Sequence, residues 1–334
     1  MNQRSRLERL AATELAILMK RSTRYWLLAL GLVTAAAVVQ PAIAAEFPKN
    51  SAGFPIHAPT NWEMWFQPAA SPIQKSIDWM MKFVLWIMLG VVLLVAGLLG
   101  YIIVRFNAKR NPIPSTTTHN TLIEVIWTLV PALLLIIIFV PSLNMIFQQS
   151  DYKNPYMTVR VIGHQWYWEY DYLGVKGVDF TSYAVPPNQL KPGQIKQLSV
   201  DHPLVVPANR KIVFQITSGD VLHSFFIPSL GVQRYAIPGQ YWHQWTKIDA
   251  PGIYYGECNQ ICGMNHDDMP IEIVALPMAQ FQAWLTEAKA DAAQGDVPSV
   301  HKYEVMAEAA AAKAADLSNS GVALASATPP AAIH

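Results

Sequence analysis

The hydrophobic positions of this 334-residue chain form long apolar runs in its first half and short alternating runs further on. Two runs, residues 83–104 and 125–150, carry no charged side chain and are long enough to cross a bilayer. Pro131 and Pro141 lie inside the second run and are expected to bend or bound it. The pattern therefore predicts a transmembrane helical hairpin within residues 75–150.

A shorter apolar run, residues 26–39, predicts a signal peptide over residues 1–44. Basic residues precede this run, and the small residues Ala42 and Ala44 suit a cleavage site. The alternative is a retained third membrane helix, for which the run is short. Residues 45–74 would then form an exported segment that leads into the hairpin.

The charges of the link between the two spans predict the orientation of the protein. Arg105, Lys109 and Arg110 lie in this link, and basic loops stay in the cytoplasm. Both outer ends of the hairpin then face the exported side, as the signal peptide independently indicates. We expect a bacterial inner-membrane protein whose folded domain lies in the periplasm.

The folded domain is predicted to be all-β over residues 151–277. Short runs rich in β-branched and aromatic residues alternate with Pro and Gly turns, which favours a sandwich or small barrel. The predicted strands include residues 157–163, 196–202, 211–219, 241–249, 252–258 and 270–276. A helix is expected over residues 278–294, followed by a disordered Ala- and Pro-rich tail over residues 295–334.

Composition supports a membrane protein and excludes a nucleic-acid-binding one. Hydrophobic residues make up 52% of the chain and charged residues only 14%, which is more apolar than ordinary soluble enzymes. The net charge of +1 provides no field that would attract a nucleic acid.

The candidate chemistry lies in residues 256–271, which hold the only two cysteines of the chain, Cys258 and Cys262. A disulfide is the ordinary interpretation in an oxidising compartment, and spacing alone does not dismiss it. His266 and Met269 follow closely, however, and thiolate, imidazole and thioether together are the ligand set for copper. Two cysteines would let both thiolates bridge two copper ions, each needing one imidazole and one weak ligand.

The two-copper interpretation requires a second histidine from elsewhere in the chain. His223 is the best candidate because it lies at a strand end just after a glycine turn. Met264 is nearer to the cysteines than Met269, and spacing does not rank these two methionines.

Four stretches are informative together: "GHQWYWEYDY", "DVLHSFFIPSLG", "YYGECNQICG" and "NHDDMPI". On these motifs the chain resembles, over residues 73–285, subunit II of the haem–copper cytochrome c oxidases, the subunit that contains the CuA centre. It implies a cupredoxin-like Greek-key barrel behind the two-helix anchor. It also implies that Cys258 and Cys262 bridge two copper ions. His223 and Met269 would complete one copper, and His266 with the main-chain carbonyl of Gln260 would complete the other.

The resemblance further implies the function. Single electrons would pass from cytochrome c to the copper pair and then to the haem of subunit I, where oxygen is reduced to water with proton translocation. The expected partners are cytochrome c, subunit I, the other oxidase subunits and the membrane.

The aromatic stretch at residues 165–172 is the second candidate site. On a strand, Trp166 and Trp168 would share one face. The resemblance marks Trp166 as the point of electron entry, whereas core packing is the alternative and is preferred for Trp168. Acidic residues should surround Trp166 to receive a basic cytochrome c; Asp171, Asp179 and Asp220 are the candidates.

Glu124 is an ionisable residue at the inner edge of the second span, which favours a functional interpretation. It matches a family glutamate at the entry of a proton channel into subunit I. The alternative is a favourable negative charge at a helix N-terminus.

The sequence departs from the family in three ways. Gln260 replaces the usual glutamate that helps to bind magnesium at the contact with subunit I, so magnesium binding is in doubt. Tyr235 replaces an aspartate. Asp267 and Asp268 lie beside His266 and should lower the reduction potential of the copper pair, unless they face water.

Other classes of protein fit the sequence less well. A quinol oxidase subunit II lacks the copper ligands, and a nitrous oxide reductase needs a large propeller domain. A membrane-anchored copper carrier is the remaining alternative, although such a carrier needs neither the "GHQWYW" strand nor the helix pair.

Overall fold

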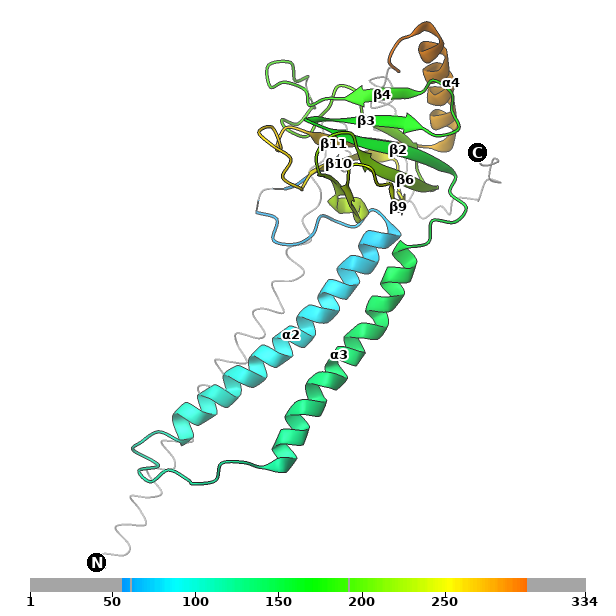
Figure 1. The fold of residues 1–334 in the computed structure, drawn as a ribbon. Helices are drawn as coiled ribbons and strands as arrows, with labels where there is room; N and C mark the ends of the chain where they lie inside the picture. The colour runs from blue at the N-terminus through cyan, green and yellow to red at the C-terminus, as the bar shows by residue number, and fades with distance from the viewer. Residues whose placement is uncertain (1–55, 61, 192, 299–334) are drawn as a thin grey trace, which may run out of the picture. The chain divides into compact units, whose positions relative to one another are not determined.

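The computed structural model describes residues 56–298, apart from residues 61 and 192. The predicted signal peptide and nearly all of the predicted disordered tail therefore lie outside the described residues. The described chain contains two long helices, two β-sheets and a C-terminal helix, as Figure 1 shows.

The two long helices are α2 (Pro72–Arg105) and α3 (Thr121–Gln149). Each begins at a capping residue whose side-chain oxygen accepts a backbone N–H, Ser71 for α2 and Asn120 for α3. Both have a mean hydropathy above 2.5 over their most apolar window, and no residue of that window is buried. Lipid is the solvent that suits such surfaces, so these are the membrane-spanning helices. Helix α3 continues through both of its prolines.

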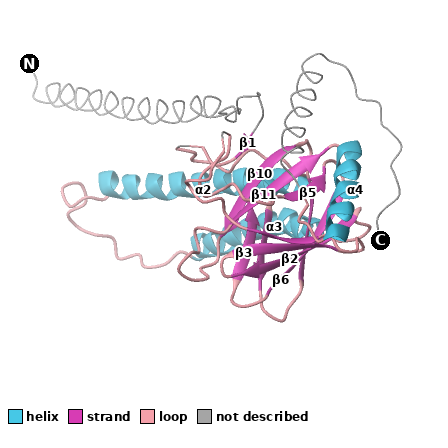
Figure 2. Ribbon diagram, turned by 90° about the horizontal axis from the view of Figure 1, so that it is seen from above, coloured by secondary structure: helices cyan, strands magenta, loops and turns pink. Residues whose placement is uncertain are grey.

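Two sheets form a sandwich, and all of their strands except β1 follow the helices (Figure 2). One has the strand order β5-β11-β10-β7-β8, with the short β1 also paired to β10, and the other has the order β4-β3-β2-β6-β9. The strands of the first sheet are β1 (Ile56–His57), β5 (Leu204–Pro207), β7 (His223–Ile227), β8 (Val232–Ala236), β10 (Gly252–Cys258) and β11 (Pro270–Leu276). Those of the second are β2 (Met157–His164), β3 (Tyr167–Tyr172), β4 (Asp179–Ser182), β6 (Lys211–Ser218) and β9 (Trp242–Lys247).

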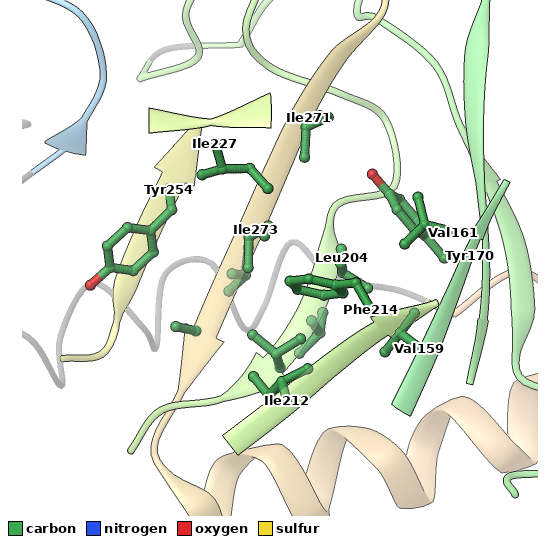
Figure 3. Packing of buried hydrophobic residues seen from close by; sticks show 14 of the residues in the cluster. Val159, Val161, Tyr170, Leu204, Ile212, Phe214, Ile227, Tyr254, Ile271 and Ile273 are labelled. Carbon is green, nitrogen blue, oxygen red and sulfur yellow. The ribbon is translucent and has the colours of Figure 1, made fainter. Parts of the chain in front are cut away.

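The core lies between the two sheets and is made of alternate residues along the strands. Strand β2 alternates strictly between buried and half-buried positions, which is the period of a sheet with one face in the core. Every residue of β11 is buried, because its second face is covered as well. Figure 3 shows Val159 and Phe214 of one sheet close to Leu204 and Ile273 of the other.

The sandwich and the two-helix anchor agree with the fold class predicted from sequence, with one wrong strand. Residues 196–202 form a turn and an isolated bridge from Val200 to Ala184, not a strand. Helix α4 (Met278–Gln294) covers the residues that the pattern indicates, and it buries Phe281 and Trp284 against the core.

Polar contacts join the N-terminal end of α2 and the C-terminal end of α3 to the β-domain. The Ser71 hydroxyl donates to the carbonyl of Leu230 at 2.6 Å, and Lys75 pairs with Asp249 at 2.6 Å. Near the end of α3, the Trp245 indole donates to the carbonyl of Gln148 at 2.8 Å. The β-domain is therefore attached directly to the helix ends.

Candidate metal centre

The candidate metal centre forms where the loop between β10 and β11 meets the start of β7. Cys258 is the last residue of β10, and Pro270, the first residue of β11, pairs with its neighbour Glu257. The antiparallel pairing thereby closes residues 259–269 into one loop. Strand β7 lies on the other side of β10, with Phe225 opposite Cys258, which brings His223 to the same end of the sheet.

Five predicted ligand side chains converge at this end of the sandwich. The Cys258 and Cys262 sulfurs are 3.9 Å apart, and His223 Nδ1 lies 4.0 Å from the Cys258 sulfur. His266 Nδ1 and Met269 Sδ each lie 3.5 Å from the Cys262 sulfur. The main-chain oxygen of Gln260 is 3.3 Å from the Cys258 sulfur. All six predicted donors are thus gathered within one small volume.

The structure distinguishes the two methionines that spacing leaves unranked. The Met269 side chain is 1% exposed and lies against Cys262, whereas Met264 is 85% exposed. Met269 is anchored because β11 begins at the next residue, while Met264 lies in the middle of the loop. Only Met269 is placed as a donor.

The two cysteines are free thiols and not a disulfide. Their sulfurs are almost 2 Å further apart than the length of a disulfide bond, which is about 2.05 Å. Burial and the neighbouring Cys258 raise the pKa of Cys262 to about 12. The Cys262 thiol therefore resists ionisation on its own, and a bound cation would favour its thiolate. This soft donor set suits copper.

Asp220 holds the ring of His223 from behind. The His223 Nε2–H donates to Asp220 Oδ1 at 2.8 Å, so the opposite nitrogen, Nδ1, is left free to face the cysteines. Burial lowers the pKa of His223, which keeps the imidazole neutral as a metal ligand requires. Burial would raise the pKa of Asp220, but hydrogen bonds from His223 and two backbone N–H groups lower it overall. Sequence reasoning named Asp220 only as a docking acid and missed this contact.

Two glycines, on β2 and β10, allow these strands to approach β7 closely at the metal centre. A Cβ on Gly163 would lie 2.8 Å from the His223 ring, and one on Gly256 would lie 2.2 Å from the Phe226 carbonyl oxygen. Real Cβ atoms do not come this close to a backbone atom. The positions of β7 and of the His223 ring therefore depend on both glycines.

Trp166 lies beside the metal loop, although not where the strand pattern predicts. It belongs to the turn between β2 and β3, so the prediction that it shares a strand face with Trp168 is wrong; the turn interrupts the alternation. A Cβ on Gly263 would lie 2.9 Å from the ring of Trp166. Trp168 is fully buried, and its indole donates to the carbonyl of Met269 at 3.2 Å.

Gln165 ties this turn to the centre. Its side-chain amide donates to the carbonyl of Cys262 at 2.8 Å, and its backbone N–H donates to Asp220 Oδ2 at 2.7 Å. The turn that carries Trp166 is therefore bound both to a cysteine and to the carboxylate behind His223. No signal in the sequence alone indicates either contact.

Two of the three candidate docking acids have internal partners. Asp171 pairs with Arg160 at 3.1 Å, and Asp220 is bound to His223. Asp179 is exposed on β4. Asp267 and Asp268 are exposed too, so water screens their charges from the centre.

Glu124 lies on α3, away from the metal loop, whereas Gln260 lies within that loop and places its main-chain oxygen 3.3 Å from the Cys258 sulfur. Glu124 is in the first turn of α3 and accepts the backbone N–H of Asn120 at 3.2 Å, as an N-terminal capping charge does. The Gln260 side chain is half-buried, and Tyr235 is 52% exposed. Neither Gln260 nor Tyr235 provides a carboxylate for a hard cation.

The fold and the donor set define a membrane-anchored β-sandwich protein with a soft-ligand metal site. The family models "Cytochrome C oxidase subunit II, transmembrane domain" and "Cytochrome C oxidase subunit II, periplasmic domain" match residues 59–145 and 157–276. The chain belongs to the cytochrome c oxidase subunit II family. It is therefore a component of an oxidase complex with a CuA-type domain, and the family implies a copper centre.

The chain is similar to bacterial, plant mitochondrial and fungal proteins of this family. A probable cytochrome c oxidase subunit 2 of Rickettsia felis is 38% identical over 277 residues, covering 83% of this chain and 84% of the relative. That of Rickettsia prowazekii is 42% identical over 227 residues, with coverages of 68% and 72%. The crystal structure of the periplasmic domain of subunit II of cytochrome oxidase of Bradyrhizobium japonicum is 36% identical, with a TM-score of 0.39, and covers 41% of this chain and 96% of that one. Together with the two membrane-spanning helices, the bacterial relatives support an inner-membrane location.

Proposed function

We propose that this chain is the electron-accepting subunit of a respiratory cytochrome c oxidase and that it holds two copper ions. The observation that carries this proposal is the pair of buried sulfurs 3.9 Å apart, with one imidazole nearest to each. A mononuclear copper site needs only one thiolate, so the second cysteine favours a pair of metal ions.

The thiolates of Cys258 and Cys262 would be shared, and the other four donors divide into two sets. His223 and Met269 would complete one copper ion, and His266 with the Gln260 carbonyl would complete the other. When bound, the copper pair takes up one electron at a time and releases it. The chain contributes rigidity, because β7, β10 and β11 fix the ends of every ligand segment and so favour the same geometry in both redox states.

Electron entry is proposed at Trp166. Its ring packs against Gly263, the neighbour of Cys262. The hydrogen bond from the Gln165 side chain to the Cys262 carbonyl holds the turn in that place. Cytochrome c would dock over this turn, and the electron would leave toward a haem in subunit I, where oxygen is reduced to water. Because Asp171 and Asp220 already have internal partners, we expect weak electrostatic steering of the cytochrome.

The domain is proposed to face the periplasm, since the basic link between α2 and α3 belongs in the cytoplasm. Glu124 then lies at the cytoplasmic end of α3, where we propose that protons enter a channel into subunit I. Its capping contact with Asn120 is compatible with that role, because the carboxylate is only half-buried. We expect at most weak magnesium binding at the contact with subunit I, since Gln260 and Tyr235 are uncharged.

Electron paramagnetic resonance of the copper-loaded full chain tests the proposal. A mixed-valence pair shares one unpaired electron between two copper nuclei, so we expect a seven-line hyperfine pattern and two coppers per chain. Cys262→Ser should reduce the pattern to the four lines of a single copper. A four-line spectrum with one copper in the unsubstituted chain would refute the two-copper centre. Copurification with haem-containing subunits would separate an oxidase subunit from a copper carrier.

A further inference from the structure

The segment that precedes α2 carries an unusual group of exposed apolar side chains. Trp62 is 96% exposed and Met64 is 87% exposed, while Trp65 and Phe66 are each more than one third exposed. In Figure 1 this segment is the blue loop that leads into α2. Side chains of this size in water are an energetic cost, so a contiguous group of them indicates a binding surface. We call residues 62–66 the Trp-rich segment.

Contacts fix the height of the Trp-rich segment along α2. The Trp65 indole Nε1–H donates to Asp78, and Lys82 Nζ lies 5.9 Å from the centre of the same indole ring. Asp78 and Lys82 also pair with each other at 2.6 Å. Trp65 therefore lies beside the surface of α2 between Asp78 and Lys82, which are one helical turn apart.

The length of α2 gives the depth of these residues in a bilayer. Its uncharged run, Phe83–Val104, is about 33 Å long at 1.5 Å per residue. The hydrocarbon core of a bilayer is about 30 Å thick. With Arg105 at the inner boundary, the outer boundary lies near Leu85. Lys82 and Asp78 then lie roughly 4.5 and 10.5 Å beyond it, where the headgroup layer is about 5–8 Å thick.

Helix α3 gives a second estimate of this depth. The uncharged stretch from Val125 to Gln148 is about 36 Å long, so Gln148 lies roughly 6 Å outside the hydrocarbon. The Ser76 hydroxyl donates to Gln148 Oε1 at 2.9 Å, which puts these two residues at one level. By the same count along α2, Ser76 is roughly 13.5 Å outside. Asp78 is two residues deeper than Ser76, so the two counts place it roughly 3 to 10.5 Å outside the hydrocarbon, a range that includes the headgroup layer.

We propose that the Trp-rich segment is a lipid-contacting anchor that lies in the outer headgroup layer. Tryptophan suits this layer because its ring is apolar and its N–H finds polar partners, here Asp78 for Trp65. A few residues further on, the Ala70 N–H donates to the carbonyl of Ser229 at 2.8 Å. The anchor is therefore joined to the β-domain by a short, hydrogen-bonded segment, and it sets the height of that domain above the bilayer.

Tryptophan quenching in vesicles tests this assignment, because bromine on a lipid chain quenches only nearby indole rings. The full chain would be reconstituted in phosphatidylcholine vesicles brominated close to the headgroup, and Trp62→Phe would be compared with the unsubstituted protein. Trp242→Phe is the matched control, since Trp242 is an exposed tryptophan of the β-domain. We expect Trp62→Phe to remove part of the quenched emission and Trp242→Phe to remove only unquenched emission.

The same comparison in the assembled oxidase distinguishes lipid from a protein partner. Quenching of Trp62 in the complex, at the level seen for the chain alone, would support the lipid anchor. Equal quenching of the Trp62→Phe and unsubstituted proteins in vesicles would overturn it. Quenching that disappears upon assembly would overturn it too, because another subunit would then cover the ring. None of these outcomes depends on copper, so the anchor can fail while the proposed electron-transfer function stands.

Discussion

Replacing Asp220 by alanine should weaken copper binding without unfolding the domain. The substitution removes the acceptor of the His223 Nε2–H bond at 2.8 Å and that of the Gln165 backbone N–H at 2.7 Å. The His223 ring would then lose the contact that orients Nδ1 toward the cysteines. Partners of this kind change metal affinity by about 10- to 100-fold, or roughly 1.4–2.8 kcal/mol.

Competition with a copper chelator, applied to the purified full chain, would measure this loss. We expect the reduction potential to rise as well, because the carboxylate stabilises the more positive, oxidised state of the metal pair. Asp220→Asn should recover much of the affinity, since its side-chain oxygen accepts from His223, although its amide cannot accept from Gln165. Asp179→Ala, which removes an exposed acid of β4, is the control.

The reasoning would be refuted if Asp220→Ala bound copper as tightly as Asp179→Ala while circular dichroism showed both folded. His223 would then be oriented by packing alone, for example by its close contact with Gly163. A loss of affinity that Asp220→Asn does not recover at all would indicate the Gln165 contact as the decisive one.

Three further predictions follow from the same geometry. Gln260→Glu should strengthen binding of Mn²⁺, a magnesium substitute, to the purified oxidase, because a carboxylate suits a hard cation; an unchanged Mn²⁺ resonance titration would contradict this. Replacing both Asp267 and Asp268 by alanine should leave the reduction potential of the centre unchanged, since both side chains face water. A clear rise in a redox titration would show that they act on the metal after all. Gly256→Ala should destabilise the domain by several kcal/mol in urea unfolding, because its Cβ would lie 2.2 Å from the Phe226 oxygen and force β7 away from β10; a loss below about 1 kcal/mol would mean that the strands adjust freely.

The local pattern of the sequence determined the elements. Apolar runs free of charge predict the two spanning helices, because a helix in lipid must make all of its own backbone hydrogen bonds and place no charged side chain in the hydrocarbon. Alternation predicts the strands that pair regularly, such as β2 and β6. The prediction failed at residues 196–202, where a strand-like composition lies in a turn, because β-propensity depends on a neighbouring strand that this segment lacks.

Only the tertiary structure decided which residues meet at the metal centre. His223 is far from Cys258 in the chain, and they meet because β7 pairs with β10. The choice of Met269 over Met264 follows from the start of β11, and the contact of Asp220 with His223 follows from the turn before β7. Such contacts depend on strand pairing, and strand pairing is decided by how the whole core packs, so no local window of sequence contains them.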